Sequence, residues 1–180
     1  MKFTELDIIG VFLIEFEIHR DERGFFLESF NQKEFHQSID KEITFVQDNH
    51  SQSKKNVFRG LHFQKPPHAQ AKLLRVTKGK GLDVFLDIRE NSSTYGKIGK
   101  YKLSSDDAKC LYIPKGIAHG FLALENETHL QYKCSDYYHP ESEESILLEE
   151  SKYFSIGLDS LLRSKKDLTG IVFKDFISPF

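Results

Sequence analysis

Short apolar runs and alternating apolar and polar positions recur along most of the chain, and Gly, Asn, Asp, Ser or Pro separates them about every ten residues. This pattern is typical of β-strands in a sandwich or barrel. The strands that it predicts cover residues 11–18, 25–30, 43–48, 56–63, 72–77, 82–88, 98–103, 110–113, 120–124 and 128–134.

Two turns are expected to join neighbouring strands into hairpins. Residues 21–24 read Asp-Glu-Arg-Gly and present Arg23 at the tip of the first hairpin. Residues 78–81 read Lys-Gly-Lys-Gly, and glycine accepts the positive φ that tight turns need, so residues 72–88 are expected to form the second. Asn31 is a suitable cap for a short helix over residues 31–40, in which two apolar residues follow at helical spacing.

The pattern becomes less regular after residue 136. Residues 137–140 read as a loop, residues 141–150 as an acidic segment with embedded apolar residues, and residues 158–162 as a short helix. We find no internal repeat, low-complexity tract or linker. With 180 residues, 39% of them hydrophobic and 29% charged, the chain is expected to form a single domain over residues 1–180.

Charge and cysteine content narrow the possible partners. A formal net charge of -2 and a pI of about 6.4 argue against a broad surface for nucleic acid or anionic membrane, so a small molecule is the expected partner. The chain starts without a leader pattern, and no apolar run approaches the roughly 18 residues of a membrane span. We therefore expect a soluble, cytoplasmic protein in which Cys110 and Cys134 are free core thiols.

The stretch Arg-Gly-Leu-His-Phe-Gln at residues 59–64, followed by Lys72, combines an imidazole with two cations. Imidazole titrates near neutrality and can act as a base, an arginine can grip a phosphate with two hydrogen bonds, and a lysine supplies a point charge. This combination suits a site that holds an anion and moves a proton. The alternative is a buried structural His62 flanked by surface cations.

Metal binding is a second possibility, because His62, His68 and His119 could form a facial triad in a strand-rich barrel. Small barrels of the cupin type usually take two ligands from a His-x-His pair, whose period of two points both side chains inward. Here that pair is replaced by His62-Phe63-Gln64, and glutamine is a poor ligand, so we expect no metal. Residues 114–121 resemble the Pro-x-Gly turn that closes a jelly-roll barrel and delivers His119, which could otherwise serve only to cap the barrel mouth.

Across most of its length the chain resembles the dTDP-4-dehydrorhamnose 3,5-epimerase family, nucleotide-sugar epimerases of the cupin fold. The matching blocks are residues 21–26 with 28, 47–49, 59–64, 70–76, 83–89 with 93–96, 113–121, 132–133 with 137–138 and 140–141, and 164–167. The resemblance implies a mainly β, cupin-type jelly-roll (double-stranded β-helix) barrel with a few short peripheral helices.

The resemblance also implies a reaction, the inversion of C3, C5 or both in a nucleotide-diphosphate-linked 4-keto-6-deoxy sugar, in deoxysugar biosynthesis for surface polysaccharide. The ketone at C4 acidifies the neighbouring C–H bonds, and inversion through the enolate needs a base on one face and an acid on the other. By this resemblance His62 removes the proton, Asp167 orients His62, Lys72 stabilises the enolate oxygen and Tyr132 returns the proton. No cofactor is implied.

The same resemblance supplies the expected binding residues. The diphosphate would be held by Arg23 and Arg59. The nucleotide pocket would be lined by Phe26, Glu28, Gln47 and Asn49. The sugar site would be completed by His119, Tyr138 and Glu143. The alternatives are a core role for Phe26 and a solvated surface role for Glu143.

Several readings stay open. Relatives act at one centre or at both, and some accept GDP-linked heptoses in place of dTDP-linked hexoses. A 3,4-ketoisomerase of the same fold would not need a tyrosine acid, so Tyr132 favours the epimerase. A metal-dependent oxygenase is disfavoured by Gln64, and a non-catalytic binding protein has no need of both an acid and a base.

The resemblance has one departure. The family usually reads Ile-x-Trp-Pro where this chain has residues 156–159, Ile-Gly-Leu-Asp, and the chain has no tryptophan. Details of the substrate near the C-terminal region are therefore not implied. Members of the family are dimers, and the N-terminal hairpin is the element expected to pair two subunits of a homodimer.

Overall fold

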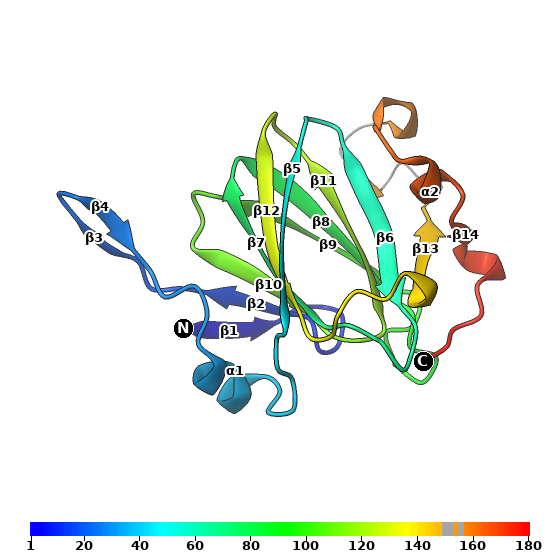
Figure 1. Cartoon of the computed structure of the whole chain (residues 1–180), viewed down its shortest axis with the longest axis horizontal. Coiled ribbons are helices and arrows are strands. Elements are labelled where there is room, and N and C mark those ends of the chain that lie inside the picture. The colour runs from blue at the N-terminus through cyan, green and yellow to red at the C-terminus, as the bar shows by residue number, and fades with distance from the viewer. Residues whose placement is uncertain (149–152, 155–156) are drawn as a thin grey trace.

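Two six-stranded sheets face each other and form a barrel in the computed structural model, which describes residues 1–148, 153–154 and 157–180 (Figure 1). The first sheet contains, in spatial order, β1 (Lys2–Glu5), β2 (Phe12–Glu15), β10 (Lys109–Ile113), β7 (Lys72–Lys78), β12 (Thr128–Cys134) and β5 (Gln47–Ser53). The second contains β14 (Ile171–Val172), β13 (Glu143–Leu147), β6 (Phe58–Gln64), β11 (Ile117–Ala123), β8 (Lys80–Asp87) and β9 (Ile98–Ser104). The mainly β barrel predicted from the strand spacing is confirmed.

The core lies between the sheets, because alternate residues of each strand point inward. One buried cluster joins Leu74 and Leu130 of the first sheet to Phe85 and Phe121 of the second. This cluster fills one part of the barrel interior, and the remaining part is lined by polar side chains and stays open.

Short helices and the C-terminal segment cover the outer faces of the sheets. The helix α1 (Gln32–Ser38) buries Phe35 against the first sheet, and Asn31 caps it by accepting hydrogen bonds from the next backbone N–H groups, as predicted. The second sheet is covered by the chain that carries the 3₁₀ turns η3 (Leu158–Ser160) and η4 (Phe173–Asp175) and the helix α2 (Lys165–Leu168). A further 3₁₀ turn, η1 (Pro140–Ser142), precedes β13. No helix within the described ranges is long and apolar enough to cross a membrane.

The predicted hairpin over residues 72–88 is wrong. β7 pairs with β10 and β12, whereas β8 pairs with β9 and β11, so the chain passes from one sheet to the other at Gly79. Gly79 has a φ of 78°, which suits glycine, but a corner between sheets needs this conformation as much as a hairpin does.

Other boundaries also differ from the predictions. The first hairpin is confirmed at its turn, but its strands are only β3 (His19–Asp21) and β4 (Gly24–Phe26), because residues 12–15 pair with β1 and β10 instead. The strand expected at residues 43–48 begins at Gln47, β1 and β13 were not anticipated, and the helix expected at residues 158–162 is a single 3₁₀ turn. Two predicted features lie partly outside the described residues. They are the end of the acidic segment, residues 149–150, and Ile156, the first residue of the block 156–159 that differs from the family pattern.

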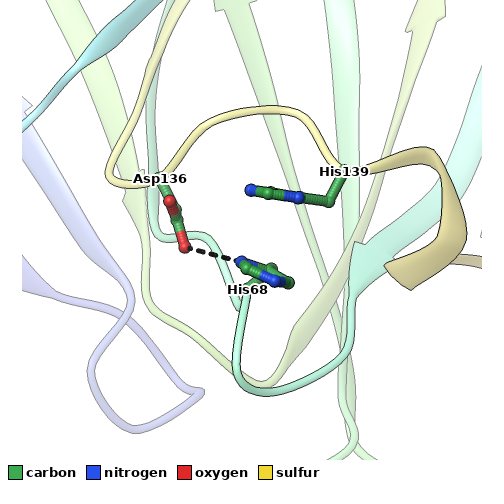
Figure 2. Close-up of side chains that lie close together, drawn as sticks. All are labelled: His68, Asp136 and His139. Atoms are coloured by element: carbon green, nitrogen blue, oxygen red, sulfur yellow. Dashed lines mark ion pairs between the residues drawn. The ribbon is translucent and has the colours of Figure 1, made fainter.

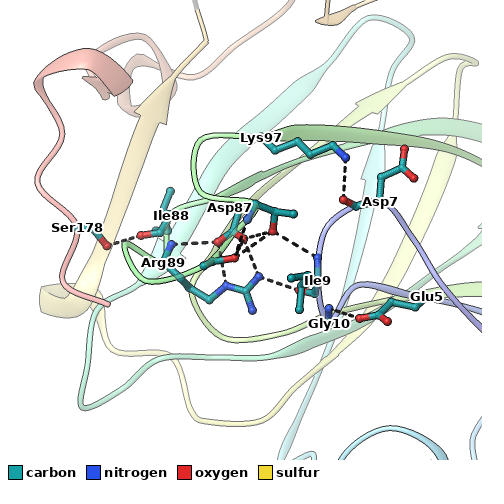
Figure 3. A network of polar contacts seen from close by, with 11 residues as sticks. Glu5, Asp7, Ile9, Gly10, Asp87, Ile88, Arg89, Lys97 and Ser178 are labelled. Carbon is teal, nitrogen blue, oxygen red and sulfur yellow. Dashed lines mark hydrogen bonds and ion pairs between the residues drawn. The ribbon is translucent and has the colours of Figure 1, made fainter.

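A polar network ties the end of β8 to the N-terminal loop (Figure 3). Both carboxylate oxygens of the buried Asp87 accept hydrogen bonds from Arg89, at 2.8 and 2.7 Å, and Ser92 and Thr94 each donate at 2.6 Å. Arg89 also donates to the carbonyl of Ile9 at 2.7 Å. Burial alone would raise the pKa of Asp87, but these hydrogen bonds lower it to about 2. Asp87 is therefore a structural anion that holds the loop against the barrel.

Candidate active site

The open part of the barrel interior contains two adjoining cavities of about 220 and 270 Å³. His62, Lys72 and Tyr132 line both of them, so the three side chains meet where the cavities join. His62 comes from β6 in the second sheet, whereas Lys72 and Tyr132 come from β7 and β12 in the first. A ligand in the cavity would therefore have the imidazole on one side and the ammonium and phenol on the other.

His62 forms a close pair with Asp167. The Nε2 atom of His62 lies 2.5 Å from Oδ1 of Asp167, although 105 residues separate the two in the sequence. Asp167 is only 4% exposed, and its Oδ2 accepts a hydrogen bond from the hydroxyl of Ser164 at 2.8 Å. Burial tends to raise the pKa of Asp167, but the hydrogen bonds from His62 and Ser164 outweigh it and lower the pKa. Asp167 is thus a fixed anion that orients the ring of His62.

The position of Asp167 follows from the local fold. Ser164 is the N-cap of α2, and Asp167 is the N3 residue of the same capping box, so each satisfies a backbone N–H of the other. α2 packs beside β13 and β6, which brings Asp167 next to His62.

Lys72 lies on the strand next to that of Tyr132, where Lys72 is directly opposite Cys134. Burial lowers the pKa of Lys72, and the neighbouring Cys134, Glu143 and Asp83 partly offset this effect. The ammonium group therefore stands in a poorly solvated cavity, where it acts strongly on a developing negative charge.

Tyr132 is partly buried in the cavity wall. Burial raises the pKa of its phenol, Cys134 and Glu143 add to the increase, and the nearby Arg59 opposes it. The phenol therefore keeps its proton at neutral pH, which makes it a proton donor rather than a base.

Two glycines bring His62 close to His119. His62 and His119 face each other across β6 and β11, and Gly60, two residues before His62, has a φ of 132° and lies beside Gly120. A Cβ on Gly60 would lie 2.5 Å from the Cα of Gly120, so only glycine allows the strands to approach this closely.

A carboxylate that we had not predicted, Asp83 on the neighbouring strand β8, contacts His119. Oδ1 of Asp83 lies 2.5 Å from Nε2 of His119, an ion-pair distance without the alignment of a regular hydrogen bond. Burial raises the pKa of Asp83, against the opposing effects of His119 and Lys72. The signal that could have revealed Asp83 is an acidic residue within the apolar run at residues 82–88.

Further residues named from the sequence line the same cavities. Arg59 lines the larger one, and its guanidinium donates to the hydroxyl of Ser53 at 3.1 Å and to the carbonyl of Gln52 at 3.3 Å. The smaller one is lined by Gln47, Asn49, Tyr138 and Glu143.

The carboxylate of Glu143 is held at the edge of the smaller cavity. The hydroxyl of Tyr138 donates to Glu143 at 2.6 Å, and Lys166 forms an ion pair with the same carboxylate. Burial alone would raise the pKa of Glu143, but these two contacts lower it.

The cavity of the same chain is not reached by Arg23, Phe26 or Glu28. The β3–β4 hairpin projects away from the barrel, with Arg23 paired to Asp21 at its tip and Phe26 68% exposed (Figure 1). Glu28 accepts a hydrogen bond from Asn31 at 2.9 Å.

The facial triad of histidines is not assembled. Throughout the part of the chain that the structure describes, the group of three potential ligands within 4.8 Å is His68, Asp136 and His139, without His62 or His119. Gln64 is buried, and its side chain amide bonds to backbone groups of His68, Tyr137 and His139. Gln64 thus joins two loops, a role that the sequence did not suggest.

The barrel has the cupin-type fold of the relatives described next, and these relatives show that the protein is an isomerase. The chain belongs to the dTDP-4-dehydrorhamnose 3,5-epimerase family, whose model matches residues 5–175. The enzyme of that name from Escherichia coli (strain K12) is 47% identical over 172 residues, which cover 93% of this chain and 91% of that protein.

Two crystal structures show how closely the fold is shared. The dTDP-4-dehydrorhamnose 3,5-epimerase of Elizabethkingia anophelis NUHP1 has a TM-score of 0.90 and 39% identity, with 97% of each chain covered. The dTDP-6-deoxy-D-glucose-3,5-epimerase of Legionella pneumophila Philadelphia 1, in complex with dTDP-4-keto-L-rhamnose, also has a TM-score of 0.90 and 39% identity, with 96% of this chain and 93% of that chain covered. The family resemblance seen in the sequence is confirmed.

Proposed function

We propose that this epimerase inverts C3 and C5 of a dTDP-linked 4-keto-6-deoxy sugar. The observation that carries the proposal is the cavity in which the His62–Asp167 pair faces Lys72 and Tyr132 from the opposite sheet. The dTDP series is supported by the names of the E. coli relative and of the Legionella complex. GDP-linked sugars are the alternative that the assay below includes.

In this proposal His62 removes the proton from the carbon next to the ketone. Asp167 fixes the orientation of the imidazole and stabilises the positive charge that it acquires. As the C–H bond breaks, its electron pair forms the enolate and the charge moves to the oxygen at C4. Lys72 stabilises this oxygen, and the cavity strengthens the attraction because little water screens it.

Tyr132 then supplies a proton from the other face. The raised pKa of its phenol keeps it protonated at neutral pH, so the hydroxyl is ready to donate to the enolate carbon. Return of a proton from the face opposite His62 inverts the centre, whereas return from His62 restores the substrate.

The diphosphate and nucleotide are assigned to the rim of the cavity. Arg59 uses some of its N–H groups on Ser53 and Gln52, and the guanidinium has further donors for a phosphate. We assign Gln47 and Asn49 to the nucleotide, and Tyr138, Glu143 and His119 to the sugar.

The hairpin residues suggest that the active unit is a homodimer. Arg23 and Phe26 are exposed on an arm that projects from the barrel, and they would reach a nucleotide only in the site of a second copy. We therefore propose that residues 1–180 form one catalytic domain whose arm completes the site of its partner, with Glu28 at the base of the arm.

A mixing experiment tests this arrangement. Inactive Arg23→Ala and His62→Ala chains, unfolded and refolded together, should regain about a quarter of wild-type activity, because half of the dimers are mixed and each then holds one intact site. If the arm serves its own barrel, every site carries one change and the mixture stays inactive. Light scattering of the wild-type protein gives the dimer mass independently.

The free thiols of Cys110 and Cys134 agree with a reducing compartment, so we propose the cytoplasm as the place of the reaction. Fractionation of cells that make the protein tests this.

The decisive test of the reaction is hydrogen exchange. Incubation with a dTDP-linked 4-keto-6-deoxyhexose in D2O should introduce deuterium at C3 and C5, which NMR measures. A parallel incubation uses the GDP-linked sugar. His62→Ala should abolish exchange at both carbons, and the matched control His129→Ala, which changes a partly exposed histidine outside the cavity, should not. Absence of exchange with both nucleotide series would contradict the proposal.

A further inference from the structure

We propose that His68, Asp136 and His139 form a binding site for Zn²⁺ at the rim of the cavity. One ligand atom from each residue lies within 4.8 Å of the other two. Two imidazole nitrogens and one carboxylate oxygen suit a borderline transition-metal ion such as Zn²⁺ rather than Mg²⁺ or Ca²⁺, which prefer oxygen ligands alone.

The three side chains converge from two loops (Figure 2). His68 lies on the loop between β6 and β7, and Asp136 and His139 lie on the loop that follows β12. The ring of His139 stacks on that of His68 with centroids 3.5 Å apart, and one of its nitrogens points toward Asp136. Nδ1 of His68 is 3.7 Å from Oδ2 of Asp136, close to the roughly 3.4 Å between two ligands of a tetrahedral zinc ion.

Two of the candidate ligands, Asp136 and His139, are oriented by a second contact. Oδ1 of Asp136 accepts the backbone N–H of Tyr137 at 2.8 Å, which leaves Oδ2 turned to His68. Nδ1 of His139 is 3.4 Å from the carboxylate of Glu141, which favours a proton on Nδ1 and a free lone pair on Nε2. Histidines that bind metals usually have such a carboxylate on their other nitrogen.

The loops that carry the ligands are fixed to each other, so the site is largely assembled before a metal arrives. Gln64 donates to the carbonyls of His68 and Tyr137 at 2.7 and 3.1 Å, and its own oxygen accepts the N–H of His139 at 2.8 Å. Gln70 donates to the carbonyl of Asp136 at 2.7 Å. A turn of the His139 ring out of the stack would complete the coordination.

The three side chains remain accessible, each about a third exposed, with values of 33%, 30% and 31% for His68, Asp136 and His139. Water can therefore occupy the fourth position of a tetrahedral ion. Because Tyr138 lies between Asp136 and His139, a metal held by both would fix the backbone on either side of a residue that lines the cavity.

Titration of the metal-free protein with ZnCl₂, followed by calorimetry, tests the site without reference to activity. The wild type should bind one Zn²⁺ per chain, and His139→Ala and Asp136→Asn should each weaken binding at least about tenfold. Co²⁺ should give the absorption bands of a four-coordinate ion in the wild type, and His139→Ala should lose them. Melting curves show whether each variant is folded.

The matched control is His129→Ala, since His129 forms the other close histidine pair, with His50 at 2.9 Å. This variant should bind Zn²⁺ as tightly as the wild type. The proposal is overturned if the wild type takes up no Zn²⁺ at 100-fold metal excess. It is also overturned if His129→Ala abolishes Zn²⁺ binding and His139→Ala retains it. Neither result depends on whether the protein is active as an epimerase.

Discussion

The pairing of His62 with Asp167 gives the sharpest test of the proposed chemistry, through the substitution Asp167→Asn. Asparagine has nearly the same size and can keep the capping hydrogen bonds with Ser164, but it carries no charge. The substitution therefore removes the electrostatic support of the imidazole and leaves the packing of α2 in place.

The distance sets the expected size of the effect. For an imidazolium 2.5 Å from a carboxylate, an effective dielectric constant of about 20 gives an attraction of roughly 7 kcal/mol as an upper bound. The cost of burying the carboxylate offsets part of it, and about 3–5 kcal/mol of transition-state stabilisation remains. At about 1.4 kcal/mol per factor of ten, kcat should fall roughly 10²- to 10⁴-fold.

The assay is deuterium exchange at C3 and C5 under saturating substrate, with KM measured alongside. We expect kcat to fall and KM to change by less than about threefold, because Asp167 acts through His62 rather than on the substrate. Asp159→Asn, which changes an exposed carboxylate in the same region, is the matched control and should behave as the wild type. The reasoning is refuted if Asp167→Asn, shown to be folded by its melting curve, keeps kcat within threefold of the wild type.

Three further predictions address the acid, the strand contact and the buried anion. Tyr132→Phe should still exchange deuterium at C3 while forming little inverted product, and unchanged product formation would remove Tyr132 from the role of acid. Gly60→Ala should lower the melting temperature by about 4–8 °C, which calorimetry measures. Gly60 has a φ of 132°, and a Cβ on it would lie 2.5 Å from the Cα of Gly120, so we expect a strain of roughly 2 kcal/mol. An unchanged melting temperature would show that β6 and β11 can separate. Asp87→Asn should lower the free energy of unfolding by about 2.6 kcal/mol at pH 7, because the folded pKa of about 2 lies below the unfolded value near 3.9. This stabilisation is present above pH 4 and is lost as the pH falls toward 2, so urea titrations of the wild type and Asp87→Asn should converge over that range; a constant difference would contradict the linkage.

Strand positions could be read from the sequence more securely than strand partners. The prediction for residues 128–134 matches β12, because alternation of apolar and polar residues reports which face of a strand is buried. The same alternation says nothing about which sheet a strand joins. The turn at residues 78–81 therefore looked like a hairpin, although Gly79 carries the chain across the barrel to the other sheet.

The candidate site divides in a similar way. His62, Lys72 and Tyr132, which were named from the sequence, lie together in the cavity, and a capping box 105 residues away brings Asp167 to His62. Asp83 was missed because an acidic residue within an apolar run marks a buried carboxylate but does not name its partner, and His119 lies on another strand.

The arrangement of the cavity has a consequence for how its chemistry could be altered. The side chains proposed as base and as acid stand on different sheets, so the gap between them is set by the large residues that separate the sheets, among them Phe85 and Phe121. Trimming or enlarging these apolar residues would change the spacing of proton removal and proton return without touching either group. Selection for a new sugar could therefore act through the core of the barrel as well as through the loops at its rim.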